Sequence, residues 1–256
     1  MQVVNLDIPQ EVGYLVPLGD LHRGDTHLTS RGLDKLKGYL DWVMARSNAF
    51  IFLMGDILNV ASRSSKTNPF ESDKDEYAKS VELFRPYAAR IVGCITGNHE
   101  QRMYKEFGFN PLQPFCRELG IPYCGYSSVL RIRVGKRVDR RNEYRQMYWG
   151  FAHHGTGGGG TMGAALNKKV KLQEIVHGMD FYMAGHDHQL INGKRGVYFP
   201  HKDKIELQRV HYIDTGSFLD WNEAYTEEGA MPIAEAGAAR LRFDGRHGHH
   251  DLHVSI

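Results

Sequence analysis

The stretch "FLMGDILN" at residues 52–59 runs an apolar segment into a Gly-Asp turn, and "ITGNHEQR" at residues 95–102 runs a second one into Gly-Asn-His-Glu. A short apolar run bounded by a turn is typical of a buried strand. Each stretch therefore predicts a strand that delivers one or two polar side chains to the edge of a sheet. The function of the protein depends on what those side chains hold.

The first half of the chain alternates predicted strands and helices. Apolar runs at residues 13–20, 49–56 and 90–98 predict strands. Apolar residues at helical spacing predict helices at 29–47 and 72–89. A β-α-β-α-β order indicates an α/β fold with a parallel sheet and right-handed crossovers.

The second half is richer in predicted strands. Residues 126–134 and 144–155 resemble a hairpin, residues 163–178 predict a helix, and residues 180–188 predict a strand. Further strands are expected at 195–200, 205–217 and 238–245. No linker, repeat or low-complexity tract divides the chain, so we expect a single domain over residues 1–256.

Composition excludes several classes of protein. The 256 residues are 41% hydrophobic and 24% charged, which is typical of a globular protein and not of a disordered one. A net charge of +2 is too small for a protein that binds nucleic acid or membrane surfaces over its whole face. Three cysteines without metal-like spacing indicate reduced thiols in the cytoplasm, and no 18-residue apolar stretch predicts a membrane span.

Five segments share one pattern, in which a predicted strand ends at a metal-ligating side chain. They are Asp20-Leu21-His22, Gly55-Asp56, Gly97-Asn98-His99-Glu100, His153-His154-Gly155 and Gly185-His186-Asp187-His188. Carboxyl ends of strands in open α/β sheets converge on one crevice. Oxygen and imidazole ligands without thiolates suit Mn, Fe or Zn and argue against a structural zinc site. Two divalent ions about 3.5–4 Å apart would share a bridging carboxylate.

These motifs, D-x-H, G-D-x-x-N, G-N-H-E, H-G and G-H-x-H in that order from residue 20 to residue 188, resemble the calcineurin-like metallophosphoesterase superfamily. The resemblance implies an α/β fold, a four-layer α/β/β/α sandwich of two mixed sheets. It also implies two divalent metal ions, with Mn expected and Fe, Zn or Ni as alternatives.

The resemblance further implies a role for each motif residue. One metal ion would be held by Asp20, His22 and His188, the other by Asn98, His154 and His186, with Asp56 as the bridge. A metal-bridging hydroxide would attack phosphorus. His99 would stay free of metal and contact the phosphoryl group or protonate the leaving oxygen.

The second motif distinguishes branches of the superfamily. Protein phosphatases carry an Asp followed by an Arg where this chain has Asn59 and Val60. "GDILN" with "GHDH" is more similar to the phosphodiesterase and nuclease branches, and the region around 153–167 is similar to small phage and prophage metallophosphoesterases. Asn59 is expected to hydrogen-bond His99 and, being uncharged, to leave it a weaker general acid. Phosphodiesters are therefore the expected substrates, with nucleic acids and cyclic nucleotides among the candidates.

Two alternatives remain beside this interpretation. One is a phosphomonoesterase, including a protein phosphatase. The other is a non-catalytic, protein-binding scaffold of the same fold, which the complete ligand set argues against. The expected partner is a phosphate-ester substrate and not a membrane, and the sequence leaves a homo-oligomer open.

Five further features of the sequence carry expectations of their own. The glycine run at 157–160 is either a lid over the substrate or a plain loop, and the basic segment 131–145 is more typical of a solvated hairpin end than of a nucleic-acid track. Lys168, Lys169 and Lys171 are expected on the solvated face of a helix, and the histidine-rich residues 246–256 on the surface. Specificity is expected in loops at 60–75, 103–115, 155–162 and 189–204.

Overall fold

Two mixed β-sheets form the centre of the protein. The computed structural model describes residues 1–60, 75–136, 146–157, 161–201, 203–220, 235–246 and 250–256. The six-stranded sheet is ordered β1 (Gln2–Ile8), β5 (Ser127–Val134), β6 (Gln146–His153), β7 (Phe181–Ala184), β9 (Lys204–Thr215), β8 (Leu190–His201). The five-stranded sheet is ordered β11 (Leu252–Ser255), β10 (Arg240–Asp244), β2 (Val12–Leu18), β3 (Ala49–Leu53), β4 (Ile91–Cys94).

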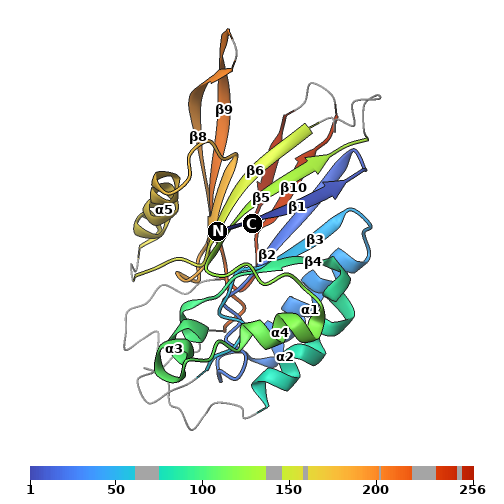
Figure 1. Cartoon of the computed structure of the whole chain (residues 1–256), viewed down its shortest axis with the longest axis vertical. Helices are drawn as coiled ribbons and strands as arrows, with labels where there is room; N and C mark the ends of the chain where they lie inside the picture. The colour runs from blue at the N-terminus through green and yellow to red at the C-terminus, as the bar shows by residue number, and fades with distance from the viewer. Residues whose placement is uncertain (61–74, 137–145, 158–160, 202, 221–234, 247–249) are drawn as a thin grey trace.

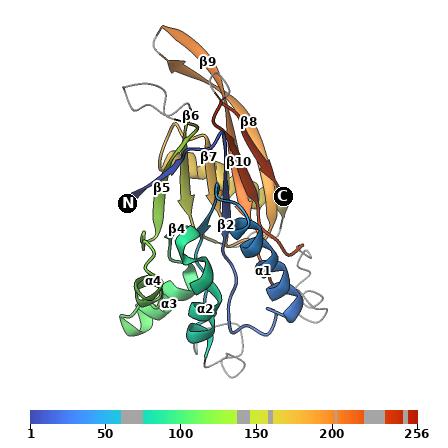
Figure 2. The same cartoon turned by 90° about the vertical axis from the view of Figure 1, so that its right-hand side faces the viewer.

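Helices cover the outer face of each sheet. One apolar cluster joins the five-stranded sheet to α1 (Ser30–Met44), α2 (Glu76–Phe84) and α4 (Leu112–Leu119). A second cluster lies between the two sheets, and a third joins the six-stranded sheet to α5 (Met162–Lys171). Figures 1 and 2 show these layers, which confirm the α/β/β/α sandwich. None of the helices in the described ranges is long and apolar enough to cross a membrane.

The predicted elements of the first half are confirmed, with shorter helices. The helix expected at 72–89 is α2 followed by a 3-10 turn, Arg85–Arg90, in which Pro86 stands near the start. The helix expected at 163–178 ends as α5 at Lys171 and continues as a 3-10 turn, Leu172–Glu174. The predicted hairpin is β5–β6, antiparallel from Ser127↔His153 to Val134↔Gln146.

Two segments expected as specificity loops have regular structure instead. Residues 103–115 are mostly helical, in α4 and in α3 (Asn98–Phe107), which begins at the candidate ligand Asn98 itself. Residues 189–204 are mostly β8, paired along its whole length with β9 in a hairpin that projects beyond the rest of the molecule (Figure 1). Most of the expected loop at 60–75 lies outside the described residues.

Parallel pairing brings the functional segments to one edge of the molecule. Strand β3 runs parallel to β2 and β4, while β7 runs parallel to β6 and β9. The carboxyl ends of parallel strands meet at the same sheet edge. The turns after β2, β3 and β4 therefore face those after β6 and β7 across the contact between the two sheets.

We predict that Gly150 in β6 cannot be enlarged. A Cβ atom at Gly150 would lie 2.0 Å from the ring of Phe181, whereas one at Gly38, on the exposed side of α1, meets nothing within 4 Å. Gly150→Ala should lower the free energy of unfolding by about 1–3 kcal/mol through overpacking. Gly38→Ala should raise it by about 0.5–1 kcal/mol. Urea denaturation measures both, and equal effects would contradict the tight packing between β6 and β7.

Candidate metal centre

Two clusters of side chains lie side by side where the turns meet. In the first, His22 Nε2 lies 3.0 Å from His188 Nε2, which lies 3.3 Å from Asp20 Oδ1. The potential ligand atoms of these three residues all lie within 4.8 Å of one another. The structure therefore brings together three of the predicted ligands, from the turns that follow β2 and β7.

The second cluster combines residues from the turns that follow β4, β6 and β7. Asn98 Oδ1 lies 2.9 Å from His154 Nε2 and 2.6 Å from His186 Nδ1. Asp56 stands between the clusters, because its Oδ2 atom lies 3.2 Å from His154 Nε2 and 3.7 Å from His22 Nε2. This is the placement that a carboxylate shared by two cations requires.

The candidate ligands share an uncommon backbone conformation. Six non-glycine residues in the described ranges have φ between 46° and 73°, and they are Asp20, His22, Asp56, Val60, His186 and His188. Five of these six are predicted ligands. A residue held in such a conformation costs about 1–3 kcal/mol and persists only where its surroundings enforce it.

The close approach of neighbouring turns explains why a glycine precedes several ligands, in the recurring G-D, G-N and G-H pairs. A Cβ atom at Gly97 would lie 2.0 Å from Asp56 Oδ1, and one at Gly185 would lie 2.1 Å from Asp20 Oδ2. Gly55 also approaches Gly97, since its Cβ would lie 2.4 Å from the Gly97 nitrogen. Each glycine is thus needed where the backbone of one turn passes a ligand or backbone of another.

Glu100 holds two of these turns together. Its fully buried carboxylate accepts hydrogen bonds from the backbone N–H groups of Asp56, Ile57, Leu58 and Gly97, at 2.8–3.1 Å. The last residue of G-N-H-E therefore positions the Asp56 turn and the start of α3. From the sequence alone, Glu100 was identifiable only as a neighbour of ligands.

His99 lies beside the clusters with one ring nitrogen occupied. Its Nδ1 atom lies 2.5 Å from the main-chain carbonyl oxygen of Asn59, and its ring packs edge-on against His22 at 4.4 Å between centroids. Because the carbonyl can only accept, Nδ1 carries the proton, and Nε2 has no hydrogen-bond partner among the described residues. The contact comes from the main chain of Asn59 and not from its side chain, whose buried Oδ1 has no hydrogen-bond partner in the described structure.

Asp56 and His154 shift each other's pKa. Burial raises the pKa of the Asp56 carboxyl, but the adjacent His154 outweighs this and holds that pKa well below its usual range. Burial lowers the pKa of His154, and the Asp56 charge overcomes it to raise that pKa to about 10. Carboxylate oxygens, an amide oxygen and imidazole nitrogens, without a thiolate, form a donor set that fits Mn²⁺, Fe²⁺ or Zn²⁺.

Two lysines that were expected in solvent, Lys168 and Lys169, form ion pairs with Asp187 in the G-H-x-H turn. Lys169 is only 1% exposed, and its Nζ lies 2.6 Å from Asp187 Oδ2 and 2.5 Å from Asp214 Oδ2. Lys168 Nζ lies 2.5 Å from Asp187 Oδ1, while Lys171 is exposed as predicted. The expectation for Lys169 was wrong because α5 packs this side chain against β7 and β9.

The helical spacing of apolar residues could have predicted the burial of Lys169. It stands four residues after Ala165 and three before Leu172, both buried, so helical spacing places it on the apolar face of α5. Asp214 is the second-last residue of β9, and the segment 216–218 follows that strand. In that segment Ser217 Oγ donates a 2.8 Å hydrogen bond to the main-chain oxygen of Asp20.

A cavity of about 380 Å³ opens beside the second cluster. It is lined by Asn98, His154 and His186 from the cluster and by Gln101 and Tyr126 from the walls, together with other residues. No Lys or Arg occurs among the described residues that line it. Residues 158–160 of the glycine run lie outside the described structure.

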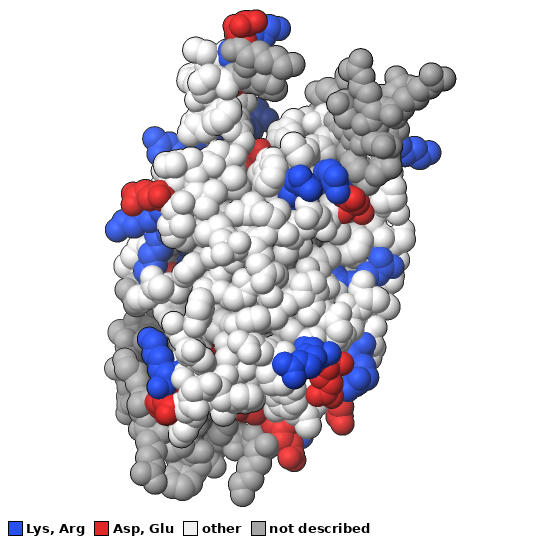
Figure 3. All heavy atoms as spheres, in the orientation of Figure 1, with Lys and Arg blue, Asp and Glu red and all other residues white. Residues whose placement is uncertain are grey.

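The basic segment 131–145 shows no free track of positive charge in its described part. Arg133 binds Asp7 through two hydrogen bonds, and Arg131 donates to Asn5 Oδ1 at 2.7 Å. Residues 137–145 lie outside the described structure. On the face drawn in Figure 3, the described basic and acidic side chains are interspersed.

A family model matches the part of the chain that contains these clusters. The family model described as calcineurin-like phosphoesterase matches residues 18–190, which include all seven candidate ligands and His99. The chain therefore belongs to the calcineurin-like phosphoesterase family. No curated protein matches the chain.

The solved structures that match the chain are distant in sequence. A protein from Streptococcus pneumoniae TIGR4 described as a predicted phosphoesterase is 14% identical, with 91% of this chain and 84% of that chain covered and a TM-score of 0.38. Vps29 from Entamoeba histolytica, complexed with Zn²⁺, is 11% identical, with 94% and 98% covered and a TM-score of 0.41. A metallophosphoesterase from Sphaerobacter thermophilus is 14% identical, with 90% and 83% covered and a TM-score of 0.40.

We predict that Lys169 stabilises the fold through its two carboxylate partners. Lys169→Met leaves Asp187 and Asp214 without that cation, and breaking a buried pair in this way costs about 3–5 kcal/mol. Lys171→Met, on the exposed side of the same helix, should change the free energy of unfolding by less than about 0.5 kcal/mol. Urea denaturation of chelator-treated protein makes the comparison, and a small effect of Lys169→Met would contradict the role of the pair.

Proposed function

We propose that the protein is a hydrolase of phosphoric diesters that uses two divalent metal ions. The observation that carries this proposal is Asp56, whose carboxylate stands between two clusters of ligand atoms in a family of phosphoesterases. In this proposal one ion is held by Asp20, His22 and His188, and the other by Asn98, His154 and His186. Mn²⁺ is the proposed ion, with Fe, Zn or Ni as alternatives.

Divalent cations bound there would supply Lewis-acid activation of a water molecule and neutralise charge on the phosphoryl oxygens. The chain's own residues orient the substrate and handle the proton. The cavity beside Asn98 and His154 leaves room for a phosphoryl group next to the clusters, with Gln101 and Tyr126 as neutral polar walls.

His99 is proposed to donate a proton to the leaving oxygen. Since Nδ1–H is held by the Asn59 carbonyl, the free Nε2 is the atom that carries and releases this proton. A neutral carbonyl stabilises the imidazolium form less than a carboxylate would. His99 is therefore a modest general acid, which suits substrates whose leaving group departs readily.

A preference for diesters is supported by the charge around the cavity. A phosphomonoester dianion carries one more negative charge than a diester and binds best where an Arg or Lys meets it. The position after Asn59 is Val60, and the described lining of the cavity holds no such cation. Nucleic acids and cyclic nucleotides are the diesters that we would assay after a synthetic substrate.

We predict a higher initial rate on an aryl phosphodiester than on the matching aryl monoester. The protein is stripped with chelator and refilled with Mn²⁺ before both assays. Asp56→Asn removes the charge of the carboxylate that the two ions would share. It should lower the rate by at least about a hundredfold, which is the largest loss usual for a residue that only supports a metal ligand. Lys171→Met is the control with an unchanged rate.

The same experiment separates the alternatives. A faster monoester reaction would contradict the diester preference and favour a phosphatase. No Mn²⁺-dependent activity, together with fewer than two bound ions per chain by elemental analysis, would contradict the enzyme and favour a protein-binding scaffold.

We also predict that residue 59 acts through its main chain. His99→Ala should lower kcat on a diester with a poor leaving group by about 10²–10⁴-fold, the usual contribution of a general acid, and less with a good leaving group. Asn59→Ala keeps the carbonyl that holds His99 and should lower kcat by less than about tenfold, the equivalent of 1.4 kcal/mol. Comparable losses in the two variants would show that the Asn59 side chain is required.

A further inference from the structure

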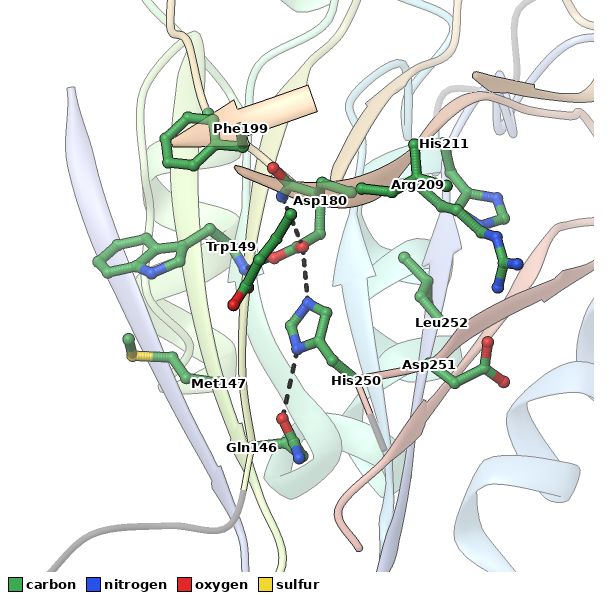
Figure 4. A pocket seen from close by; sticks show the side chains of 14 residues that line it. Gln146, Met147, Trp149, Asp180, Phe199, Arg209, His211, His250, Asp251 and Leu252 are labelled. Atoms are coloured by element: carbon green, nitrogen blue, oxygen red, sulfur yellow. Dashed lines mark hydrogen bonds and ion pairs between the residues drawn. The ribbon is translucent and has the colours of Figure 1, made fainter. Parts of the chain in front are cut away.

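A cavity lies at each end of the short strand β7. The larger, of about 690 Å³, opens at the amino end, where the buried Asp180 accepts a 2.9 Å hydrogen bond from Gln208 and lies 2.8 Å from His250 Nε2 (Figure 4). His250 also stacks on Tyr148, so this residue of the histidine-rich run is more than a surface side chain. Candidate metal ligands occur among the described lining residues of the smaller cavity, of about 380 Å³, and not of the larger one.

One side of the smaller cavity is formed by residues 155–157, here named the 155–157 wall. The wall begins against the G-H-x-H turn, because a Cβ atom at Gly155 would lie 2.9 Å from Gly185 O and 3.0 Å from His186 Cβ. The Gly155 N–H group also donates a 2.9 Å hydrogen bond to His153 Nδ1. The first residue of the wall is therefore held beside a candidate metal ligand.

The last residue of the wall is held by Lys168, which comes from α5. Its Nζ atom donates a 2.6 Å hydrogen bond to Gly157 O and lies 2.5 Å from Asp187 Oδ1. Asp187 stands between His186 and His188 in the chain. One ammonium group therefore joins the wall of the cavity to the turn that carries two candidate ligands.

The adjacent lysine makes one of these two connections and not the other. Lys169 Nζ lies 2.6 Å from Asp187 Oδ2, and its second partner is Asp214, at 2.5 Å, instead of the wall. Removal of the Lys168 ammonium group would therefore leave Asp187 with a cation. The hydrogen bond to Gly157 would be lost.

The composition of the wall makes this hydrogen bond important. Two of its three residues are glycines with φ in the left-handed region, 113° at Gly155 and 73° at Gly157. Glycine has the widest conformational freedom of any residue, so such a segment keeps one conformation only where bonds fix it. A binding surface that is already ordered costs less free energy when a ligand binds to it.

We propose that Lys168 is a positioning residue for the substrate, which holds the 155–157 wall in a fixed place relative to the G-H-x-H turn. This inference rests on the proposed hydrolase activity, whose site it extends. The phosphoryl group lies at the two clusters, and an ester group of the substrate lies along the wall. The wall offers main-chain groups and the hydroxyl of Thr156, which are neutral and match the uncharged ester group of a phosphodiester.

The kinetic test compares the full chain with Lys168→Met, both refilled with Mn²⁺. The KM for an aryl phosphodiester should rise at least about fivefold, which is less than the full contribution of a hydrogen bond to a charged group. The kcat should change by less than about threefold, because the wall contacts substrate and transition state alike. Elemental analysis should find the same number of Mn²⁺ ions per chain in both proteins.

Inorganic phosphate separates the wall from the clusters. It has no ester group to place along the wall, so its inhibition constant should change by less than about threefold in Lys168→Met. A rise equal to that of the diester KM would contradict a role of the wall, because it would show that the clusters themselves had changed.

Two matched variants test whether the effect comes from charge alone. Lys171→Met removes a positive charge from the exposed side of the same helix and should leave KM unchanged. Lys168→Arg keeps a charged donor for both Gly157 O and Asp187, and should return KM to within about threefold of that of the unaltered chain. Equal KM values in Lys168→Met and Lys171→Met would overturn the proposal.

A second measurement needs neither metal nor activity. In chelator-treated protein, NMR measures the exchange of the Gly155 amide hydrogen, which is bonded to His153. If Lys168 holds the wall, Lys168→Met should speed this exchange at least about fivefold through more frequent local opening, and Lys171→Met should not. Circular dichroism confirms that each variant is folded.

The two measurements distinguish failure of the inference from failure of the proposed function. If the unaltered chain hydrolyses neither ester, the proposed hydrolase is wrong, and the Gly155 exchange decides whether Lys168 holds the wall. If the unaltered chain is active, a loss confined to kcat or a loss of Mn²⁺ in Lys168→Met would overturn the positioning role. Equal exchange in Lys168→Met and Lys171→Met would overturn it in either case.

Discussion

The left-handed backbone at the candidate ligands is the constraint on which the rest of the structure depends. Five ligands, Asp20, His22, Asp56, His186 and His188, share it. Together they cost about 5–15 kcal/mol at 1–3 kcal/mol each, which is comparable with the whole stability of a domain. Such turns persist only if each is held from several sides. The four hydrogen bonds to Glu100, the bond from Ser217 to Asp20 and the lysine pairs of Asp187 hold them.

These restraints come from different elements of the fold. Glu100 is in α3, which follows β4 of the five-stranded sheet, and Lys169 is in α5, which packs on the six-stranded sheet. Ser217 follows β9. The site is therefore assembled only when both sheets and their helices have packed, which explains why residues so far apart in the chain form one cluster. A preformed cluster of this kind loses little entropy when it binds cations or substrate.

Much of this arrangement could be predicted from the sequence. An apolar run that ends in Gly-Asp, Gly-Asn or Gly-His indicates both a strand and a metal-ligating side chain at its end. The sequence predictions that were wrong have physical causes that a local sequence pattern does not show. The burial of Lys169 depends on Asp214, 45 residues away, which no local pattern reveals. Strand β8 contains Gly193, Gly196 and Pro200, which resemble loop residues, and only its pairing with β9 makes it a strand. Helix α3 begins inside the G-N-H-E motif, so its start looked like a turn.

The surroundings of His99 show how a residue's type can matter less than its conformation. In the sequence, Asn59 stands where relatives of the phosphatase branch carry Asp. At that level only the side chains of Asn and Asp can be compared as partners of His99. In the structure the partner of His99 is the Asn59 carbonyl, which any residue at that position would supply. The limited role proposed for His99 as a general acid then follows from the path of the turn after β3. The proposed preference for diesters accordingly follows more from the absence of Lys and Arg among the described residues of the cavity lining than from the identity of residue 59.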